Sequence, residues 1–187
     1  MRRVQAVRVL VSVMMGSLGA IFALIPPAAA DPGVFYIQNA SVGKCLEVIA
    51  NGSYNGAPLR LANCRRTATQ AWRFERYTYG PAANEQYSTT WYYIRSQASG
   101  KCLDVAGASL QDRTTIYVWD CLGGSNQQWA RGGGRNNSEI LVARHTYNSV
   151  LTAAISRVTA TPLNPYRIFI EQQLYRGRPN QEWRLHS

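Results

Sequence analysis

The segment NQQW at residues 126–129 has two counterparts in the chain, QAW at 70–72 and QEW at 181–183. The three tryptophans are 57 and 54 residues apart. A large ring that recurs at the same point of each unit is what a shared hydrophobic core requires. We therefore interpret Trp72, Trp129 and Trp183 as core residues and divide the chain into three repeats of about 55 residues each.

A second repeated segment carries the cysteines. GKCLEV at 43–48 is nearly copied as GKCLDV at 100–105, and in both copies a second cysteine follows the first by 19 residues. Equal separations in two repeats predict the disulfides Cys45–Cys64 and Cys102–Cys121, each contributing about 3 kcal/mol through the unfolded chain. These spacings are not typical of zinc ligands, and the chain has only 2 histidines, so no metal site is predicted.

Each repeat contains four short runs rich in β-branched and aromatic residues, separated by turn clusters such as NGSYNG and GGGRNN. No long amphipathic helix is predicted. The repeats span about 34–79, 90–133 and 138–187 and give twelve strands in total. The strand pattern alone predicts an all-β protein, either a barrel or a sandwich.

The first 30 residues have the layout of a secretory signal peptide. Three arginines precede an apolar run that starts at Val9 and ends in PPAAA before Asp31. The run is short for a membrane span and is interrupted by glycine and serine. We expect cleavage before Asp31, a secreted domain at 31–187, and no membrane span.

The net charge of +10 falls to +7 without that segment. The remaining arginines are spread along the chain instead of forming a block, so we predict a soluble basic surface and no specific nucleic-acid partner.

The cysteine pairs in phase with three Gln-x-Trp segments resemble the ricin B-type lectins and the related carbohydrate-binding modules of bacterial glycanases. The resemblance covers essentially all of 34–187. It implies a β-trefoil, a six-stranded barrel capped by three hairpins, with three repeats of four strands and pseudo-threefold symmetry.

The same resemblance implies a sugar site in the second repeat. A carboxylate and side-chain amides grip the hydroxyls on the edge of a sugar, and an aromatic ring covers its apolar face. By position, Asp104 corresponds to the acceptor, Trp119 to the stacking ring and Asn126 to the amide. Gln127 braces the site, and Tyr117 stands where the family often has a polar contact.

The first repeat lacks parts of this set. Glu47 replaces the aspartate, Ala62 replaces the stacking ring, Thr69 replaces the asparagine, and Arg60 stands in the place of Tyr117. We interpret this repeat as scaffold without a working site.

The third repeat has no cysteines. Val150 and Thr152 take the places of the first cysteine and the acid, whereas Asn180 and Gln181 are retained. We keep a weak third-repeat site as an alternative. Three aromatic residues lie nearby in the sequence: Tyr166, Phe169 and Tyr175.

These observations predict a secreted carbohydrate-binding protein that acts mainly through the second repeat, on a galactose-, xylose- or mannose-type glycan. No paired carboxylates, nucleophile motif or phosphate-binding loop points to an enzyme, and no cofactor is expected. The alternative is a trefoil scaffold, such as an inhibitor or adhesin, that binds a protein and carries a vestigial sugar site. The oligomeric state is left open.

Overall fold

The computed structural model describes residues 33–79, 87–156 and 167–187. These residues form twelve strands and five short 3-10 helices, with no α-helix among them. The strands are β1 (Val34–Asn39), β2 (Cys45–Val48), β3 (Ala57–Ala62), β4 (Ala71–Tyr79), β5 (Tyr87–Ser96), β6 (Cys102–Val105), β7 (Ile116–Trp119), β8 (Gln128–Gly133), β9 (Glu139–Ala143), β10 (Ser149–Ser156), β11 (Arg167–Leu174) and β12 (Trp183–His186).

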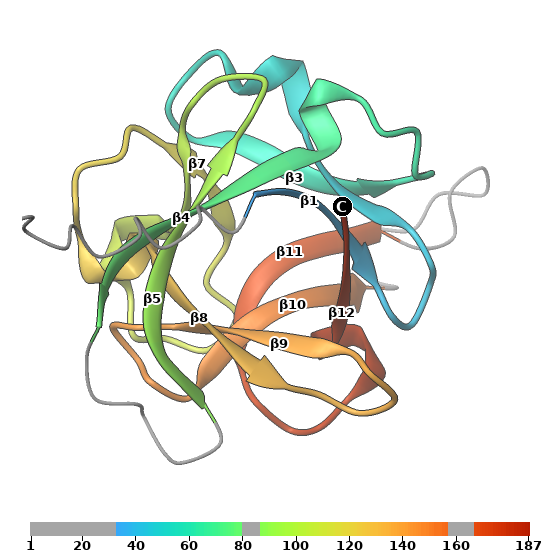
Figure 1. Ribbon diagram of the computed structural model, residues 1–187, viewed down its shortest axis with the longest axis vertical. Coiled ribbons are helices and arrows are strands. Elements are labelled where there is room, and N and C mark those ends of the chain that lie inside the picture. The colour runs from blue at the N-terminus through green and yellow to red at the C-terminus, as the bar shows by residue number, and fades with distance from the viewer. Residues whose placement is uncertain (1–32, 80–86, 157–166) are drawn as a thin grey trace, which may run out of the picture.

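Six of these strands close into a barrel. Antiparallel pairings run from β1 to β4, β5, β8, β9 and β12, and β12 pairs back with β1. The other six strands form the hairpins β2–β3, β6–β7 and β10–β11. Figure 1 looks along the barrel, with its strands around the centre and the hairpins behind and beside them. This is the predicted β-trefoil, with three repeats of four strands.

The repeated tryptophans fill the barrel as predicted. All three are fully buried, and each indole nitrogen donates to a leucine carbonyl oxygen at 3.0 or 3.1 Å. The pairs are Trp72 with Leu46, Trp129 with Leu103, and Trp183 with Leu151. A buried ring that also has its polar hydrogen satisfied is a stable core element.

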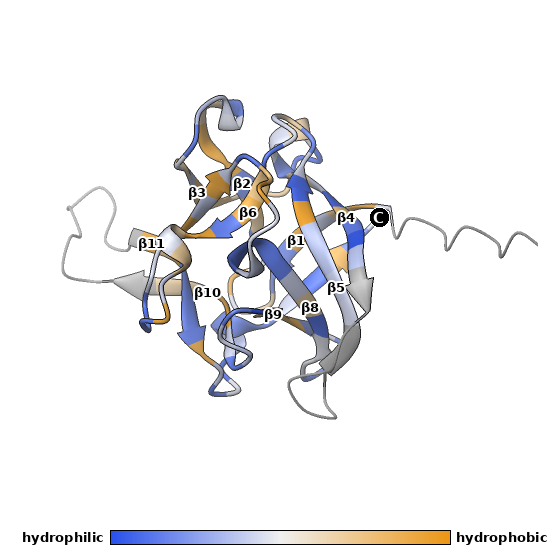
Figure 2. Cartoon of the chain, turned by 90° about the vertical axis from the view of Figure 1, so that its left-hand side faces the viewer, coloured by the Kyte–Doolittle hydropathy of each residue, from blue (hydrophilic) through white to orange (hydrophobic). Residues whose placement is uncertain are grey.

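One continuous core connects the three repeats. Hydrophobic and hydrophilic residues alternate along several strands (Figure 2), so that one face of each strand points inward. A smaller second cluster gathers Trp91, Ala130, Ile140, Val142 and Val150 on the outside of β5, β8 and β9.

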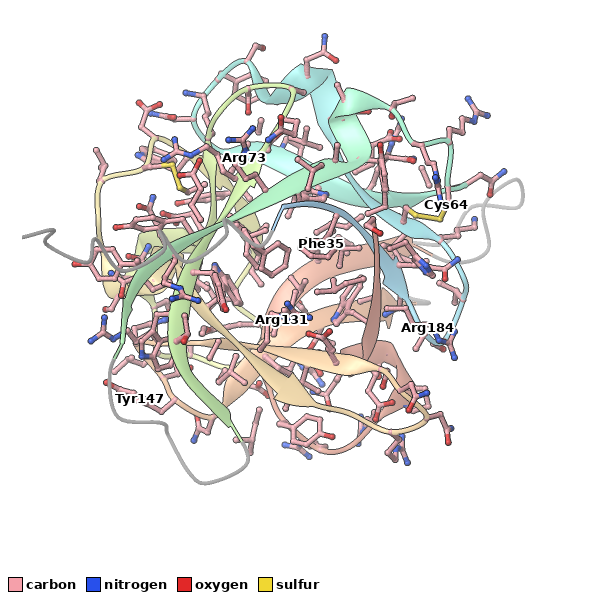
Figure 3. All side chains as sticks on the ribbon, viewed as in Figure 1. Phe35, Cys64, Arg73, Arg131, Tyr147 and Arg184 are labelled. Carbon is pink, nitrogen blue, oxygen red and sulfur yellow. A yellow bond between two sulfur atoms is a disulfide. The ribbon has the colours of Figure 1, made fainter. Side chains whose placement is uncertain are left out.

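An arginine lies near the centre of the view along the barrel. The Arg131 guanidinium is 5.6 Å from the Phe35 ring and 5.9 Å from the Phe74 ring, and its Nε donates to Glu139 at 2.6 Å. Figure 3 shows Phe35 and Arg131 together at this position. The cation–π contacts and the ion pair let a charged side chain lie over the apolar core.

Both predicted disulfides are present, Cys45–Cys64 and Cys102–Cys121. In the third repeat Val150 takes the place of the first cysteine and packs in the second cluster, against which Tyr175 also packs. Apolar packing therefore replaces the covalent link in that repeat.

The proposed signal peptide, residues 1–30, lies outside the described residues. Within the described ranges, no helix is long and apolar enough to cross a bilayer. The second repeat begins with β5 at Tyr87, slightly before the sequence-based boundary near 90.

Candidate functional site

A buried glutamine anchors the same turn in every repeat. Gln70, Gln127 and Gln181 end the 3-10 helices η2 (Ala68–Gln70), η4 (Ser125–Gln127) and η5 (Pro179–Gln181). Each Oε1 accepts from the backbone N–H five residues earlier at 2.8 Å, and each Nε2 donates to the carbonyl oxygen seven residues earlier. These bonds fix the amide so that its second N–H points at the residue two positions after the first cysteine, or after Val150 in the third repeat, where the repeats differ.

In the second repeat that residue is Asp104 on β6. Its Oδ2 accepts from Gln127 Nε2 at 2.8 Å and from Asn126 Nδ2 at 3.1 Å. Asn126 also donates to the Val105 carbonyl oxygen at 3.1 Å, which holds its amide in place. No hydrogen bond from another described residue reaches Oδ1, so a carboxylate that is only 5 % exposed keeps one oxygen for a ligand.

Two aromatic rings stand across the hairpin from this carboxylate. Asp104 pairs with Tyr117, and Cys102 pairs with Trp119. The two rings are 5.5 Å apart and tilted by 34°. The five predicted site residues line one cavity of about 470 Å³ with four others: Gly107, Ala108, Leu122 and Gly124.

Sequence reasoning missed those four residues. Leu122 is 75 % exposed and follows Cys121 directly. An apolar side chain that stays exposed at the rim of a cavity adds contact area for a ligand. A Cβ on Gly124 would clash with Asn126 Oδ1, so this glycine leaves room for the amide, a signal that is visible only once the loops are folded.

Burial sets the charge state of the site. Desolvation raises the pKa of Asp104 from 3.8 to about 6, against the opposing effect of its hydrogen bonds from Gln127 and Asn126. Burial, and then the nearby Asp104 charge, also raises the pKa of Tyr117. Asp104 is thus ionised near neutral pH, but at an energetic cost that a hydrogen-bonding ligand relieves.

Residues of the first repeat contact the strand that carries Trp119. Gly56 donates to the Val118 carbonyl oxygen at 2.9 Å, and a Cβ on this glycine would lie 3.7 Å from the Trp119 ring. Asn55 exchanges two hydrogen bonds with Asp120, at 2.9 and 3.0 Å. Trp119 therefore stands on a fixed strand, with its position set by contacts between repeats.

The corresponding place in the first repeat is filled by the chain itself. Glu47 is 8 % exposed, and its Oε2 accepts from Gln70 Nε2 at 2.8 Å. Arg60, which pairs with Glu47 across the hairpin, donates to Oε1 at 2.7 Å through Nε and also through Nη2. The carboxylate has no open oxygen left, and the site carries Ala62 and Thr69 where the second repeat has Trp119 and Asn126.

The third repeat keeps the turn but changes the surrounding groups. Asn180 donates to the Ala153 carbonyl oxygen at 3.1 Å, as Asn126 does to Val105, and Gln181 approaches the Thr152 hydroxyl at 3.5 Å. Across the hairpin Glu171 stands in the place of Tyr117, and Gln173 stands in the place of Trp119. Gln173 Nε2 donates to Glu171 Oε1 at 2.6 Å.

Two of the three aromatic residues named for the third repeat lie within the described residues. Tyr175 packs on the second cluster, Phe169 is 42 % exposed on β11, and Tyr166 lies outside the described residues. Within the described ranges, no group of three or more His, Cys, Asp or Glu side chains is placed to hold a metal ion.

Comparison with known proteins agrees with this geometry. The ricin-type β-trefoil lectin domain family matches residues 33–183. A designed threefold-symmetric protein, ThreeFoil, is 26 % identical over 82 % of this chain and 98 % of its own, with a TM-score of 0.64.

Two natural proteins show the same fold. An exo-β-1,3-galactanase from Clostridium thermocellum is 21 % identical over 83 % of this chain and 30 % of its own, with a TM-score of 0.66. The lectin of Polyporus squamosus is 20 % identical over 82 % of this chain and 48 % of its own, with a TM-score of 0.59. Since the family match spans most of the sequence, this chain belongs to the ricin-type β-trefoil lectin domain family, and membership of a lectin family supports carbohydrate binding.

Proposed function

We propose that this chain is a secreted carbohydrate-binding protein that recognises a glycan mainly through its second repeat. The observation that carries the proposal is the unused Oδ1 of Asp104, held beside Trp119 in a cavity of about 470 Å³. The first repeat has the same fold, but Arg60 occupies its carboxylate.

The arrangement fits the two surfaces of a pyranose. The Asp104 carboxylate accepts hydrogen bonds from hydroxyls on the sugar edge, and Asn126 and Gln127 hold it in direction. Trp119 and Tyr117 offer ring faces to the C–H groups of the sugar. A single shallow site of this kind gives weak affinity, roughly −4 to −6 kcal/mol, which corresponds to about millimolar to tens of micromolar dissociation constants.

A glycan array followed by titration calorimetry with the best ligand tests the site. Asp104→Asn keeps the shape of the side chain but removes its charge and one acceptor. Since a charged hydrogen bond contributes about 1.5–3 kcal/mol, affinity should fall roughly tenfold to a hundredfold.

The matched control is Glu47→Gln, the same chemical change in the first repeat. It should leave sugar affinity nearly unchanged. Equal binding by the parent and a folded Asp104→Asn variant would move the site elsewhere, to the third repeat or to a protein-binding surface. Sustained glycan hydrolysis by pure protein would refute the non-catalytic assignment.

Secretion is part of the same proposal. Two disulfides are consistent with folding in an oxidising compartment, and the first 30 residues read as a signal peptide. N-terminal sequencing of protein recovered from culture medium should begin at Asp31. Recovery of a chain that still begins at Met1, in the cell fraction, would contradict this.

A further inference from the structure

A second cavity lies away from Asp104, between the β8–β9 turn, the β1–β2 turn and the start of β12. Its volume is about 520 Å³. The residues that line it are Ala40, Arg135, Asn136, Pro179, Glu182 and Arg184. Pro179 belongs to η5. The next residue, Asn180, donates to the Ala153 carbonyl oxygen in β10 and therefore belongs to the third-repeat position that corresponds to Asn126, not to this cavity.

The residues beside this cavity differ from those at the corresponding place in the second repeat. In the second repeat Trp91 pairs with Ala130, two fully buried residues that fill this place in the second cluster. In the third repeat Arg184 takes the place of Ala130, one residue after the barrel tryptophan. Counting back one residue from the Trp183–Glu139 pair puts Ser138 in the place of Trp91. A hydroxymethyl group therefore replaces an indole, and an arginine replaces a methyl group.

A buried carboxylate organises the floor of this cavity. Glu182 is 4 % exposed, and both of its oxygens are used: Oε1 accepts from Arg135 Nε at 2.9 Å, and Oε2 accepts from the Ser138 hydroxyl at 2.8 Å. The side chain of Arg135 is nevertheless 56 % exposed. A guanidinium that is tethered through Nε still has terminal N–H groups to offer a ligand.

The turn that carries Arg135 is closed by backbone hydrogen bonds. Asn136 and Asn137 have φ values of 51° and 57°, the left-handed region that asparagine tolerates. The Ser138 N–H donates to the Arg135 carbonyl oxygen at 3.0 Å and closes the turn. Arg135 and Ser138 are thus held side by side over Glu182 before any ligand arrives, which lowers the entropic cost of binding.

Arg184 supplies the second cation. It is exposed on β12 and forms no ion pair with another described residue. Figure 3 shows it at the edge of the molecule, far from Arg131 at the centre. Arg135 forms an ion pair with Glu182, so the charge of Arg184 leaves the cavity with a net positive charge. The Asn136 side chain adds a neutral hydrogen-bonding group.

We propose that this cavity binds an acidic sugar residue through its carboxylate, as a second site distinct from the Asp104 cavity. A planar carboxylate matches the fork of a guanidinium. The volume, similar to that of the first cavity, fits a whole sugar ring better than a small inorganic anion. The choice of a sugar as the ligand class rests on the proposed function, whereas the anion preference rests on the two arginines alone.

The test is an NMR titration of the ¹⁵N-labelled protein with glucuronate, glucose and acetate. Glucuronate should shift the backbone amides of Asn136, Glu182 and Arg184, and glucose should not. Acetate should bind more weakly than glucuronate because it lacks the ring. Raising the salt concentration to about 0.5 M should weaken the glucuronate shifts, as expected for partly exposed charges.

Arg184→Gln should weaken glucuronate binding by about three- to tenfold. The matched control is Arg65→Gln, which removes the same charge from an exposed arginine in the first repeat and should change nothing. Equal losses in the two variants would reduce the effect to overall charge and overturn the proposal. Acetate binding as tightly as glucuronate, or no shift at these amides, would also overturn it.

The Asp104→Asn variant separates this inference from the proposed function. Its glucuronate shifts at the Arg184 cavity should match those of the parent. If no glycan binds at Asp104 while glucuronate still shifts these amides, the proposed function fails and this inference stands. Loss of the glucuronate shifts in Asp104→Asn would show that the two cavities are not independent and would overturn the inference.

Discussion

Glu47 and Asp104 occupy the same strand position in two repeats, and each accepts a hydrogen bond at 2.8 Å from the glutamine of its own turn. What differs is the residue across the hairpin. Arg60 faces Glu47 and occupies its second oxygen, whereas Tyr117 faces Asp104 and leaves its second oxygen open. The residue on the neighbouring strand thus distinguishes an acid whose two oxygens both accept within the protein from one that keeps an oxygen open.

The comparison shows that equivalent acids in two repeats of one fold can have different roles. An acid whose charge is neutralised within the protein stabilises the hairpin. An acid that is buried without a cation costs stability, and that cost is relieved when hydroxyl groups of a ligand bind. The four predictions below test this distinction, from the largest expected effect to the smallest.

Removing either disulfide should lower the stability of the whole domain by a similar amount, because the three repeats share one core. The double variants Cys45→Ala/Cys64→Ala and Cys102→Ala/Cys121→Ala should each lower the free energy of unfolding by about 3 kcal/mol. Denaturant titration measures this. Only the second variant should also lower sugar affinity, because Cys102 and Cys121 flank the strands that carry Asp104 and Trp119. Equal loss of sugar binding in both would mean that the repeats are not functionally separate.

Trp119→Ala should lower sugar affinity by roughly tenfold to a hundredfold, since it removes the ring that covers the sugar face while leaving the barrel tryptophans intact. The reciprocal change, Ala62→Trp, should add no binding, because Arg60 still occupies the Glu47 carboxylate. Calorimetry on both variants checks this. A gain of binding in Ala62→Trp would show that the missing ring, and not the arginine, silences the first repeat.

Changing the acid to its amide should stabilise the protein at Asp104 and destabilise it at Glu47. Desolvation raises the pKa of Asp104, so its contribution to stability is fully present below about pH 4 and is lost as the pH rises through about 6. Asp104→Asn should therefore raise the free energy of unfolding at pH 7 by up to about 2 kcal/mol. Glu47→Gln should lower it by about 1–2 kcal/mol, because Arg60 and Gln70 lose a charged partner.

Denaturant titrations at pH 7 and pH 4 provide the check. The advantage of Asp104→Asn over the parent should shrink to a small fraction at the lower pH, where Asp104 is protonated in the folded state and only partly ionised in the unfolded chain. If both variants lose stability at pH 7, the claim that the Asp104 charge costs stability while the Glu47 charge contributes to it would be contradicted.

The fold was predictable from the sequence because it is repeated. Equal cysteine spacings and three Gln-x-Trp segments report the same geometry several times. Both disulfides followed from the spacings, and the β-trefoil followed from the family resemblance that these segments carry. The second-repeat cavity was predictable in its five named residues, because Asp104, Tyr117 and Trp119 lie at fixed offsets from the cysteines. That their side chains bind a sugar remains a prediction.

Two features were not predictable. The ion pair between Arg60 and Glu47 depends on the hairpin register, which only the folded structure gives, although both residues had been noted as departures from the second repeat. The Arg184 cavity depends on Ser138 and Arg135, which belong to a hairpin in a different part of the sequence. Such contacts between distant segments leave no periodic signal in the chain.

The smallest predicted effect is the pH dependence of sugar affinity. Among the residues that line the second-repeat cavity, Asp104 is the only one that changes charge between pH 5 and pH 7. Tyr117, facing it across the hairpin, has its pKa raised and stays neutral there. His145 contacts the carbonyl oxygen of Ser109, next to Ala108 of the cavity, and burial lowers its pKa from the ordinary value, so it is less protonated than a free histidine across this range.

With the pKa of Asp104 at about 6, the ionised fraction falls about tenfold between pH 7 and pH 5, and affinity should fall by about the same factor. Calorimetry across this range measures it, and the residual affinity of Asp104→Asn should stay flat as the control. Because protonation turns one oxygen of Asp104 into a donor, affinity that rises toward pH 5 would mean that the sugar accepts a hydrogen bond from this group. In that case the distinction between the two repeats would lie in the open space around Asp104 and not in its charge.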